Sequence, residues 1–191
     1  WFEIKPEIFF QLHITMITNK TNSLNVCVVL PAYNAEKTLQ KTYNDIPVNF
    51  RKNVILVDDA SHDNTTKLAK KLNITVHRHK NNLGYGGNQK TCYRLALKSG
   101  ADIVVMIHPD YQYDPKLIKY FVDMIKDNYF DVMLGSRIRS RKEALAGGMP
   151  KYKYYSNRFL TIVENTLSGM NLSEWHTGMR AYSREVLKSI K

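Results

Sequence analysis

Short runs of apolar and β-branched residues recur along the chain and alternate with amphipathic segments. The runs are NVCVVL at 25–30, VILV at 54–57, ITVHR at 74–78, IVVMI at 103–107 and DVML at 131–134. Runs of this length and composition are typical of strands that are buried on both faces. We predict five strands, and we expect the first to stop at Pro31.

The segments between these runs carry apolar residues at helical spacing. The first follows Asn34, a residue type that caps helices, and stops at Pro47. Further helical patterns lie at 68–72, 92–99, 117–125 and 159–167, and a last helix starts near the end of the chain. Strands that alternate with helices form βαβ units, so we predict an α/β fold with a mostly parallel central sheet and helices on both faces. Ligands of such sheets bind beyond the carboxyl ends of the strands.

The length of 191 residues fits one domain, which we assign to residues 24–191. Residues 1–23 lack the small-residue cleavage site of a signal peptide, and we treat them as an N-terminal extension in which Met16 is a candidate start. No apolar run approaches the roughly 18 residues that a membrane span needs. Two cysteines, Cys27 and Cys92, are too few for a disulfide framework, which favours a reducing, cytoplasmic setting.

Charge narrows the class of partner. Lys and Arg total 28 against 17 Asp and Glu, a formal net charge of +11 that favours anionic partners: nucleic acid, a membrane surface or phosphorylated small molecules. In residues 137–158 Glu143 is the sole acid among many basic residues, with glycines and a proline between them, and we predict a mobile basic loop. Because the charge gathers there rather than along a helix or an aromatic-studded sheet, we expect no nucleic-acid partner. A diphosphate or a membrane surface is the alternative to a merely solvated loop.

Polar clusters directly follow the second and fourth predicted strands. Asp58 and Asp59 come after VILV, where a carboxylate can accept a hydrogen bond from a base N–H or a ribose hydroxyl, or can simply form a turn. His108, Asp110 and Gln112 alternate after IVVMI, so in an extended backbone all three point the same way. An imidazole, a carboxylate and an amide oxygen at one point make a plausible divalent-metal site, and a hydrated turn is the alternative.

Two further segments carry candidate residues. NNLGYGGNQKT, with Gly84 and Lys90, can cradle phosphate before a helix, although it matches neither the P-loop nor the dinucleotide fingerprint. In SEWHTGMR, Glu174 is a candidate base and Arg180 a candidate phosphate clamp; a capping and turn segment is the alternative.

Six segments together resemble the family 2 glycosyltransferases, whose GT-A fold is a Rossmann-like sheet. In chain order they are VVLPAYNAEKTL, ILVDDASHDNT, NNLGYGG, MIHPDYQYDP, LGSR and SEWHTGMRAYSREVL. They span residues 25 to about 188, and several match the dolichol-phosphate mannosyltransferase branch. Many members of this family continue past the position that corresponds to Lys191. The resemblance therefore also implies that residues 24–191 can be a domain truncated at its C-terminal end.

The resemblance assigns roles to individual residues. Pro31 and Tyr33 match the edge that packs on the nucleobase, and Asp59 matches the acid that recognises it. His108-Pro109-Asp110 stands at the metal motif, and Gln112 matches an additional ligand of the branch. The expected nucleotide-sugar-binding residues are Pro31, Tyr33, Asn34, Asp58, Asp59, Gly84, Lys90 and Asp110; the expected metal ligands are Asp110, His108 and Gln112; and the expected catalytic residues are Glu174, Arg137 and Arg180.

Two positions depart from the family pattern. His108 replaces the first metal-binding Asp, which removes one negative charge and favours Mn²⁺ over Mg²⁺ because imidazole suits the softer ion. Ala35 stands where the polyprenyl branch often has Glu.

The resemblance implies an inverting, metal-dependent transferase that moves a sugar from a UDP- or GDP-linked donor to an acceptor. The acceptor would be a polyprenyl (dolichyl) phosphate, reached at the cytoplasmic face of a membrane. Alternatives are transfer to a sugar hydroxyl in cell-envelope polysaccharide synthesis, with Glu174 as base, and a non-catalytic nucleotide-sugar-binding relative with an altered metal motif. A sugar-1-phosphate nucleotidyltransferase or a nicotinamide dehydrogenase would need glycines after the first strand, where this chain has PAYN.

Overall fold

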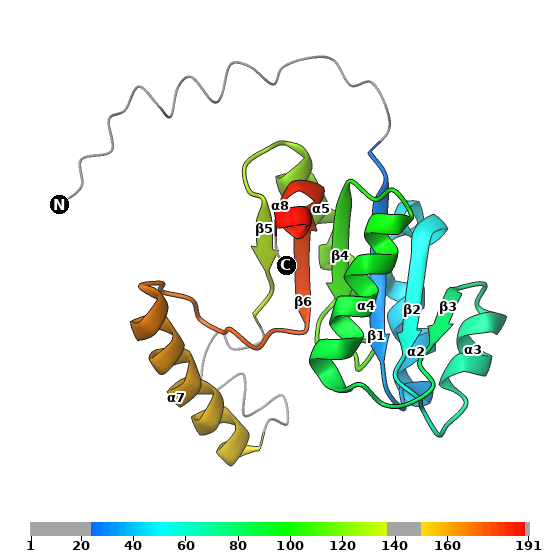
Figure 1. Ribbon diagram of the computed structural model, residues 1–191, viewed down its shortest axis with the longest axis horizontal. Helices are drawn as coiled ribbons and strands as arrows, with labels where there is room; N and C mark the ends of the chain where they lie inside the picture. Colours follow the sequence, from blue (N-terminus) through cyan, green and yellow to red (C-terminus); the bar gives the residue numbers. More distant parts are fainter. Residues whose placement is uncertain (1–23, 137–149, 190–191) are drawn as a thin grey trace.

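The computed structural model describes residues 24–136 and 150–189. Their strands form one six-stranded sheet with the order β3-β2-β1-β4-β6-β5 (Figure 1). Strands β3, β2, β1 and β4 are parallel, and β6 is antiparallel to both β4 and β5. The elements in chain order are β1 (Val26–Ala32), α2 (Glu36–Asp45), η1 (Val48–Asn53), β2 (Val54–Asp58), α3 (Thr65–Lys71), β3 (Thr75–Arg78), α4 (Gly84–Lys98), β4 (Ile103–Ile107), η2 (Pro115–Leu117), α5 (Ile118–Lys126), β5 (Val132–Leu134), α7 (Lys151–Ser168), β6 (Met179–Ser183) and α8 (Arg184–Ser189).

Helices cover both faces of the sheet, as the sequence predicts (Figure 1). Alternate residues of β1 point to opposite faces, so that Val28 and Leu30 join the core with α2, α3 and α5, whereas Cys27 and Val29 pack with α4 and α8. Both faces of the central strands are therefore buried, which explains their continuous apolar sequence. The prediction of an α/β fold with a mostly parallel sheet is confirmed.

Strand β1 does not stop at Pro31 but continues to Ala32. Its ladder with β4 ends at the pair Val29 and Met106, whereas its ladder with β2 continues to Ala32 and Asp58. At Pro31 the strand therefore has a partner on one side, and the missing proline N–H interrupts no ladder with β4.

Asn34 does not cap α2. It has a positive φ of 51°, and the helix starts two residues later at Glu36. The amide groups of Ala35 and Glu36 donate instead to Thr65 Oγ1 at 2.8 Å and Asp63 Oδ2 at 3.0 Å. The unpaired amide groups at the start of α2 are thus capped by side chains that come from residues 63 and 65. The sequence around α2 alone does not predict this capping.

The C-terminal third differs most from the prediction. Residues 137–149 of the expected basic loop lie outside the described residues, and residues 151–158 are helical as the first half of α7. Strand β6 was not predicted; it lies between β4 and β5. Among the described residues, no helix combines the length and the apolar character needed to cross a membrane.

Candidate nucleotide-sugar site

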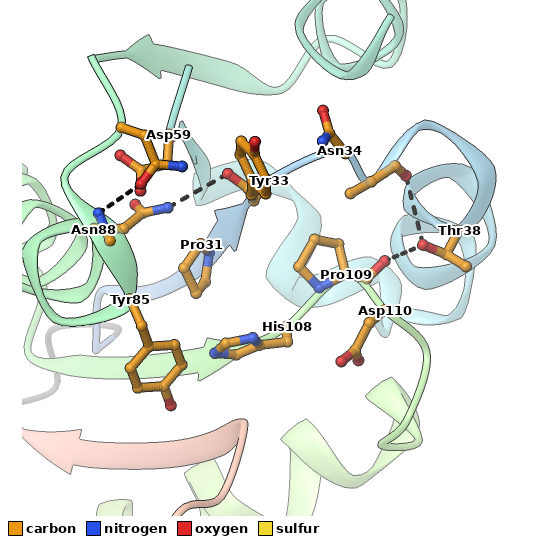
Figure 2. Close-up of a pocket in the computed structure, with 14 residues that line it drawn as sticks. Pro31, Tyr33, Asn34, Thr38, Asp59, Tyr85, Asn88, His108, Pro109 and Asp110 are labelled. Carbon is orange, nitrogen blue, oxygen red and sulfur yellow. Dashed lines mark hydrogen bonds between the residues drawn. The ribbon is translucent and has the colours of Figure 1, made fainter. Parts of the chain in front are cut away.

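A cavity of about 350 Å³ lies at the carboxyl ends of β1, β2 and β4, beside the start of α4 (Figure 2). This is the edge at which ligands of parallel sheets bind. Its lining residues are Pro31, Ala32, Tyr33, Asn34, Ala35, Thr38, Asp59, Asn82, Gly84, Tyr85, Asn88, His108, Pro109 and Asp110. The structure thus brings together four of the motif segments.

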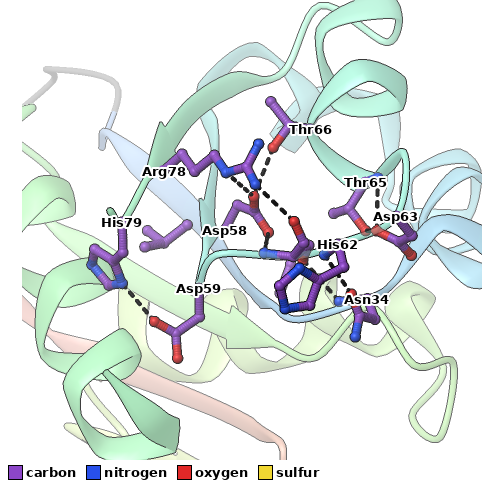
Figure 3. A network of polar contacts seen from close by, with 12 residues as sticks. Asn34, Asp58, Asp59, His62, Asp63, Thr65, Thr66, Arg78 and His79 are labelled. Carbon is purple, nitrogen blue, oxygen red and sulfur yellow. Dashed lines mark hydrogen bonds and ion pairs between the residues drawn. The ribbon is translucent and has the colours of Figure 1, made fainter. Parts of the chain in front are cut away.

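Asp58 and Asp59 point in opposite directions, although they are neighbours in the sequence (Figure 3). Asp58, fully buried, accepts hydrogen bonds from Thr66 Oγ1 at 2.7 Å and Ser61 N at 3.2 Å, and pairs with Arg78 at 3.3 Å. Asp59 lines the cavity. Asp58 therefore stabilises the turn after β2, and Asp59 is the acid available to a ligand.

The backbone of residues 108–112, which follow β4, is not extended as the prediction requires. Tyr111 has a positive φ of 60°, and Asp110 Oδ1 accepts a hydrogen bond from the Gln112 amide at 3.0 Å, so the backbone turns. His108 and Asp110 line the cavity, whereas Gln112 is not among its lining residues. The described residues contain no group of three or more His, Cys, Asp and Glu side chains arranged to hold a metal ion.

The His108 ring is fixed by its neighbours. It packs beside Tyr85, with 5.2 Å between the ring centroids, as Figure 2 shows. The backbone amide of His108 donates to Gly178 O at 3.0 Å, and a Cβ built on Gly178 would lie 3.2 Å from two ring carbons of His108. A glycine at 178 therefore lets the backbone before β6 approach the cavity.

The glycine-rich segment forms the start of α4 itself rather than a loop before it. Gly84, Tyr85 and Asn88 line the cavity; Lys90 is exposed and does not. The buried Asn88 side chain donates to Val57 O at 3.1 Å and Ala32 O at 3.4 Å, which ties α4 to the ends of β2 and β1.

Two of the three expected catalytic residues, Glu174 and Arg180, are described by the structure, and neither is among the residues that line the cavity. Glu174 is buried, and Ser136 Oγ donates to it at 3.4 Å, so two of the motif segments meet. Arg180 donates to Thr177 O and Trp175 O, both at 3.1 Å. Burial lowers the pKa of the Arg180 guanidinium, but interactions with Tyr182, Tyr85 and Tyr93 together outweigh this and raise that pKa overall. Arg137 lies outside the described residues.

Several lining residues were not predicted from the sequence: Ala32, Ala35, Thr38, Asn82, Tyr85, Asn88 and Pro109. Asn88 could have been found, because it lies one helical turn before Cys92 and two before Ala96 on the buried stripe of α4. A polar residue on such a stripe needs a hydrogen-bond partner or a ligand. Thr38 has no such signal; its hydroxyl donates to Pro109 O across the cavity wall.

Comparison with known proteins agrees with this geometry. The family model of glycosyl transferase family 2 matches residues 27–191. The UDP-N-acetylglucosamine–dolichyl-phosphate N-acetylglucosaminyltransferase of Methanococcus voltae is 31% identical over 180 residues, which cover 85% of this chain and 71% of the relative. The dolichyl-phosphate hexose transferase of Haloferax volcanii is 30% identical over 169 residues, covering 87% and 70%.

A solved structure has the same fold. The glucosyl-3-phosphoglycerate synthase from Mycobacterium tuberculosis, in complex with Mn²⁺ and uridine-diphosphate-glucose, superposes with a TM-score of 0.63 at 21% identity. The match covers 88% of this chain and 59% of that chain, so this chain spans about six-tenths of its length. These findings confirm the GT-A fold and the resemblance to the dolichol-phosphate branch.

Proposed function

The chain belongs to glycosyl transferase family 2, and from this premise we propose that it transfers a sugar from a nucleoside-diphosphate donor to an acceptor, with inversion at the sugar carbon. The observation that carries the proposal is the shared cavity: Tyr33 from the end of β1, Asp59 from the end of β2 and Asp110 from beyond β4 line one space. Its volume of about 350 Å³ is within the range of small-molecule sites.

The donor would lie with its base near β1 and β2 and its diphosphate near β4. Pro31 and the half-exposed Tyr33 ring offer an apolar surface for the base, and Asp59 can accept a hydrogen bond from it. His108 and Asp110 lie at the end of the cavity formed by the β4 loop (Figure 2).

We also propose a divalent cation at this end of the cavity. Mg²⁺ and Mn²⁺ at phosphate sites are held by one or two protein groups together with phosphate oxygens and waters, so Asp110 and His108 suffice as protein ligands. Gln112 would have to turn to join them. The bound ion would neutralise the charge that develops on the departing diphosphate. The relative solved with Mn²⁺ and uridine-diphosphate-glucose supports this assignment.

The acceptor we propose is a polyprenyl phosphate, as the names of the two archaeal relatives suggest. A phosphate acceptor is already an anion and needs no strong base. For a sugar hydroxyl, the alternative acceptor, Glu174 would be the base. The ring of His176, two residues from Glu174, lies 3.1 Å from Glu164 of α7.

The orientation of helix α7 supports the proposal that the acceptor is a membrane lipid. Its polar side chains face the segment that follows it in the chain. Asn165 bonds the backbone of Leu172 and the Trp175 indole, and Arg158 donates to Ser173 O at 2.7 Å. Thr161, one helical turn from each, is fully buried. The polar side chains thus hold the helix to the segment that follows it.

The opposite face of α7 is apolar and exposed. It carries Tyr152, Tyr155, Phe159, Ile162 and Leu167, which fall at helical spacing. Exposed aromatic and aliphatic side chains beside basic residues are typical of helices that lie on an anionic membrane surface. We propose that residues 151–167, together with the basic segment before them, contact the membrane that holds the acceptor.

Replacement of Asp110 tests the transfer site. Asp110→Asn should reduce donor turnover by about a hundredfold or more while the unfolding curve stays unchanged, since the residue is exposed. Asp127→Asn, an exposed change outside the cavity, is the matched control. Full turnover in Asp110→Asn would refute the metal assignment. Nucleotide-sugar binding by the unaltered protein without any turnover would favour the non-catalytic alternative.

Vesicle sedimentation tests the membrane contact. The double change Phe159→Glu and Ile162→Glu should abolish binding to vesicles of phosphatidylglycerol and phosphatidylcholine, whereas Val48→Glu, at an equally exposed apolar position on η1, should not. Equal binding by both variants would refute the role of α7.

A further inference from the structure

His79 lies directly behind the acid that we assign to the nucleobase. It follows β3, is 9% exposed, and its Nδ1 is 2.7 Å from Asp59 Oδ1 (Figure 3). We propose that His79 is a positioning residue, which fixes the Asp59 carboxylate so that the site selects bases with a ring N–H. The inference rests on the proposed function, because it presumes that a nucleotide occupies the cavity.

One oxygen of the Asp59 carboxylate is fully engaged by the protein. Oδ1 meets His79 Nδ1 and also accepts a hydrogen bond from the Leu83 amide at 2.8 Å. Among the residues that the structure describes, Oδ2 has no hydrogen-bond partner, and Asp59 lines the cavity. The second oxygen is therefore the one that a ligand can use.

The far side of the imidazole is held by α4. His79 Nε2 lies 3.0 Å from Thr91 Oγ1, and that hydroxyl is also 3.2 Å from Gly87 O. Whether the hydroxyl hydrogen goes to the ring or to the carbonyl, Nδ1 must carry a proton, because an ionised carboxylate only accepts.

This arrangement fixes both the direction and the polarity of Oδ2. A carboxylate held by two donors on one oxygen cannot rotate to present a different edge, and its free oxygen remains an acceptor. Uracil and guanine offer a ring N–H to such an acceptor. Cytosine and adenine present a lone pair at the corresponding ring nitrogen, and two acceptors facing each other in a buried site are unfavourable.

Calorimetric titration with nucleoside diphosphates and Mn²⁺ tests the inference. Unaltered protein should bind UDP or GDP at least about tenfold more tightly than CDP and ADP, since an unpaired buried polar group costs at least this much. His79→Ala should weaken binding of the preferred nucleotide about tenfold, leaving kcat at saturating donor unchanged. His79→Asn, whose amide can replace the Nδ1–H donor, should restore most of the affinity.

The preferred nucleotide methylated at its ring N–H separates positioning from structural support. This analogue lacks the donor, so His79→Ala and unaltered protein should bind it equally weakly. If His79→Ala weakens both nucleotides by the same factor, or neither, the inference is wrong. His62→Ala, which changes an exposed histidine that does not line the cavity, is the matched control and should behave as unaltered protein. If unaltered protein binds no nucleoside diphosphate, the proposed function fails, and the inference fails with it.

Discussion

The close approach of Gly178 to the cavity makes replacement of that glycine by alanine a sharp test of the site. The Gly178 amide donates to Tyr113 Oη at 3.1 Å, and its carbonyl accepts from the His108 amide at 3.0 Å. An added Cβ would lie 3.0 Å from Tyr113 Cε2 and 3.2 Å from two His108 ring carbons. Carbon atoms in favourable contact are about 3.5–4.0 Å apart, so both rings must move.

The cost of this movement can be estimated. Overpacking by a single carbon in a filled site typically costs about 1–3 kcal/mol, and Tyr113 is almost fully buried. We expect Gly178→Ala to lower the free energy of unfolding by about 2 kcal/mol. Because His108 lines the cavity and packs on Tyr85, we also expect a higher KM for the donor. Urea unfolding and donor titration measure the two effects.

Gly86→Ala is the matched control for this prediction. A Cβ on Gly86 meets no atom within 4 Å, and the residue lies in α4 at an ordinary helical φ. Alanine there should raise stability by about 0.4–1 kcal/mol, because it restricts the unfolded chain. Should Gly178→Ala prove as stable and as active as Gly86→Ala, the packing of the His108 ring would not constrain the site.

Three further predictions concern Asp58, the two cysteines and His108. Asp58→Ala should lower the free energy of unfolding by about 3 kcal/mol in urea, because it leaves buried donors unpaired. Cys27 and Cys92 should react with a thiol reagent at pH 8 only after unfolding, because burial raises the pKa of Cys27 to about 12 and that of Cys92 further. His108→Asp should shift the metal preference of turnover from Mn²⁺ toward Mg²⁺, measured with each ion in turn.

The sequence predicts the central strands well, because their apolar runs reflect burial on both faces. It does not predict β6, whose sequence MRAYS alternates polar and apolar residues and contains an arginine. That strand is stabilised by pairing with β4 on one side and β5 on the other, so its formation depends on contacts between distant residues. The start of α2 is missed for the same reason, since its capping groups come from Thr65 and Asp63.

The site is predicted in part. Motif residues at strand ends, such as Tyr33, Asp59 and Asp110, do line the cavity, because the carboxyl ends of parallel strands meet at one edge. Residue type alone does not separate Asp59 from Asp58, since the two side chains are the same and differ only in direction; the family resemblance is what assigns the nucleobase to Asp59. The sequence does not single out His79, whose contribution depends on its distance from Asp59.

The position of the cavity follows from the strand order. From β1 the chain crosses to β2 through α2 on one face, and from β3 it returns to β4 through α4 on the other. The connections therefore diverge between β1 and β4, and side chains from the flanking helices bind backbone carbonyls near the strand ends. Asn88 donates to Ala32 O and Val57 O, and Thr38 donates to Pro109 O. These hydrogen bonds fix the walls of the cavity relative to one another, which pre-organises it before a ligand binds.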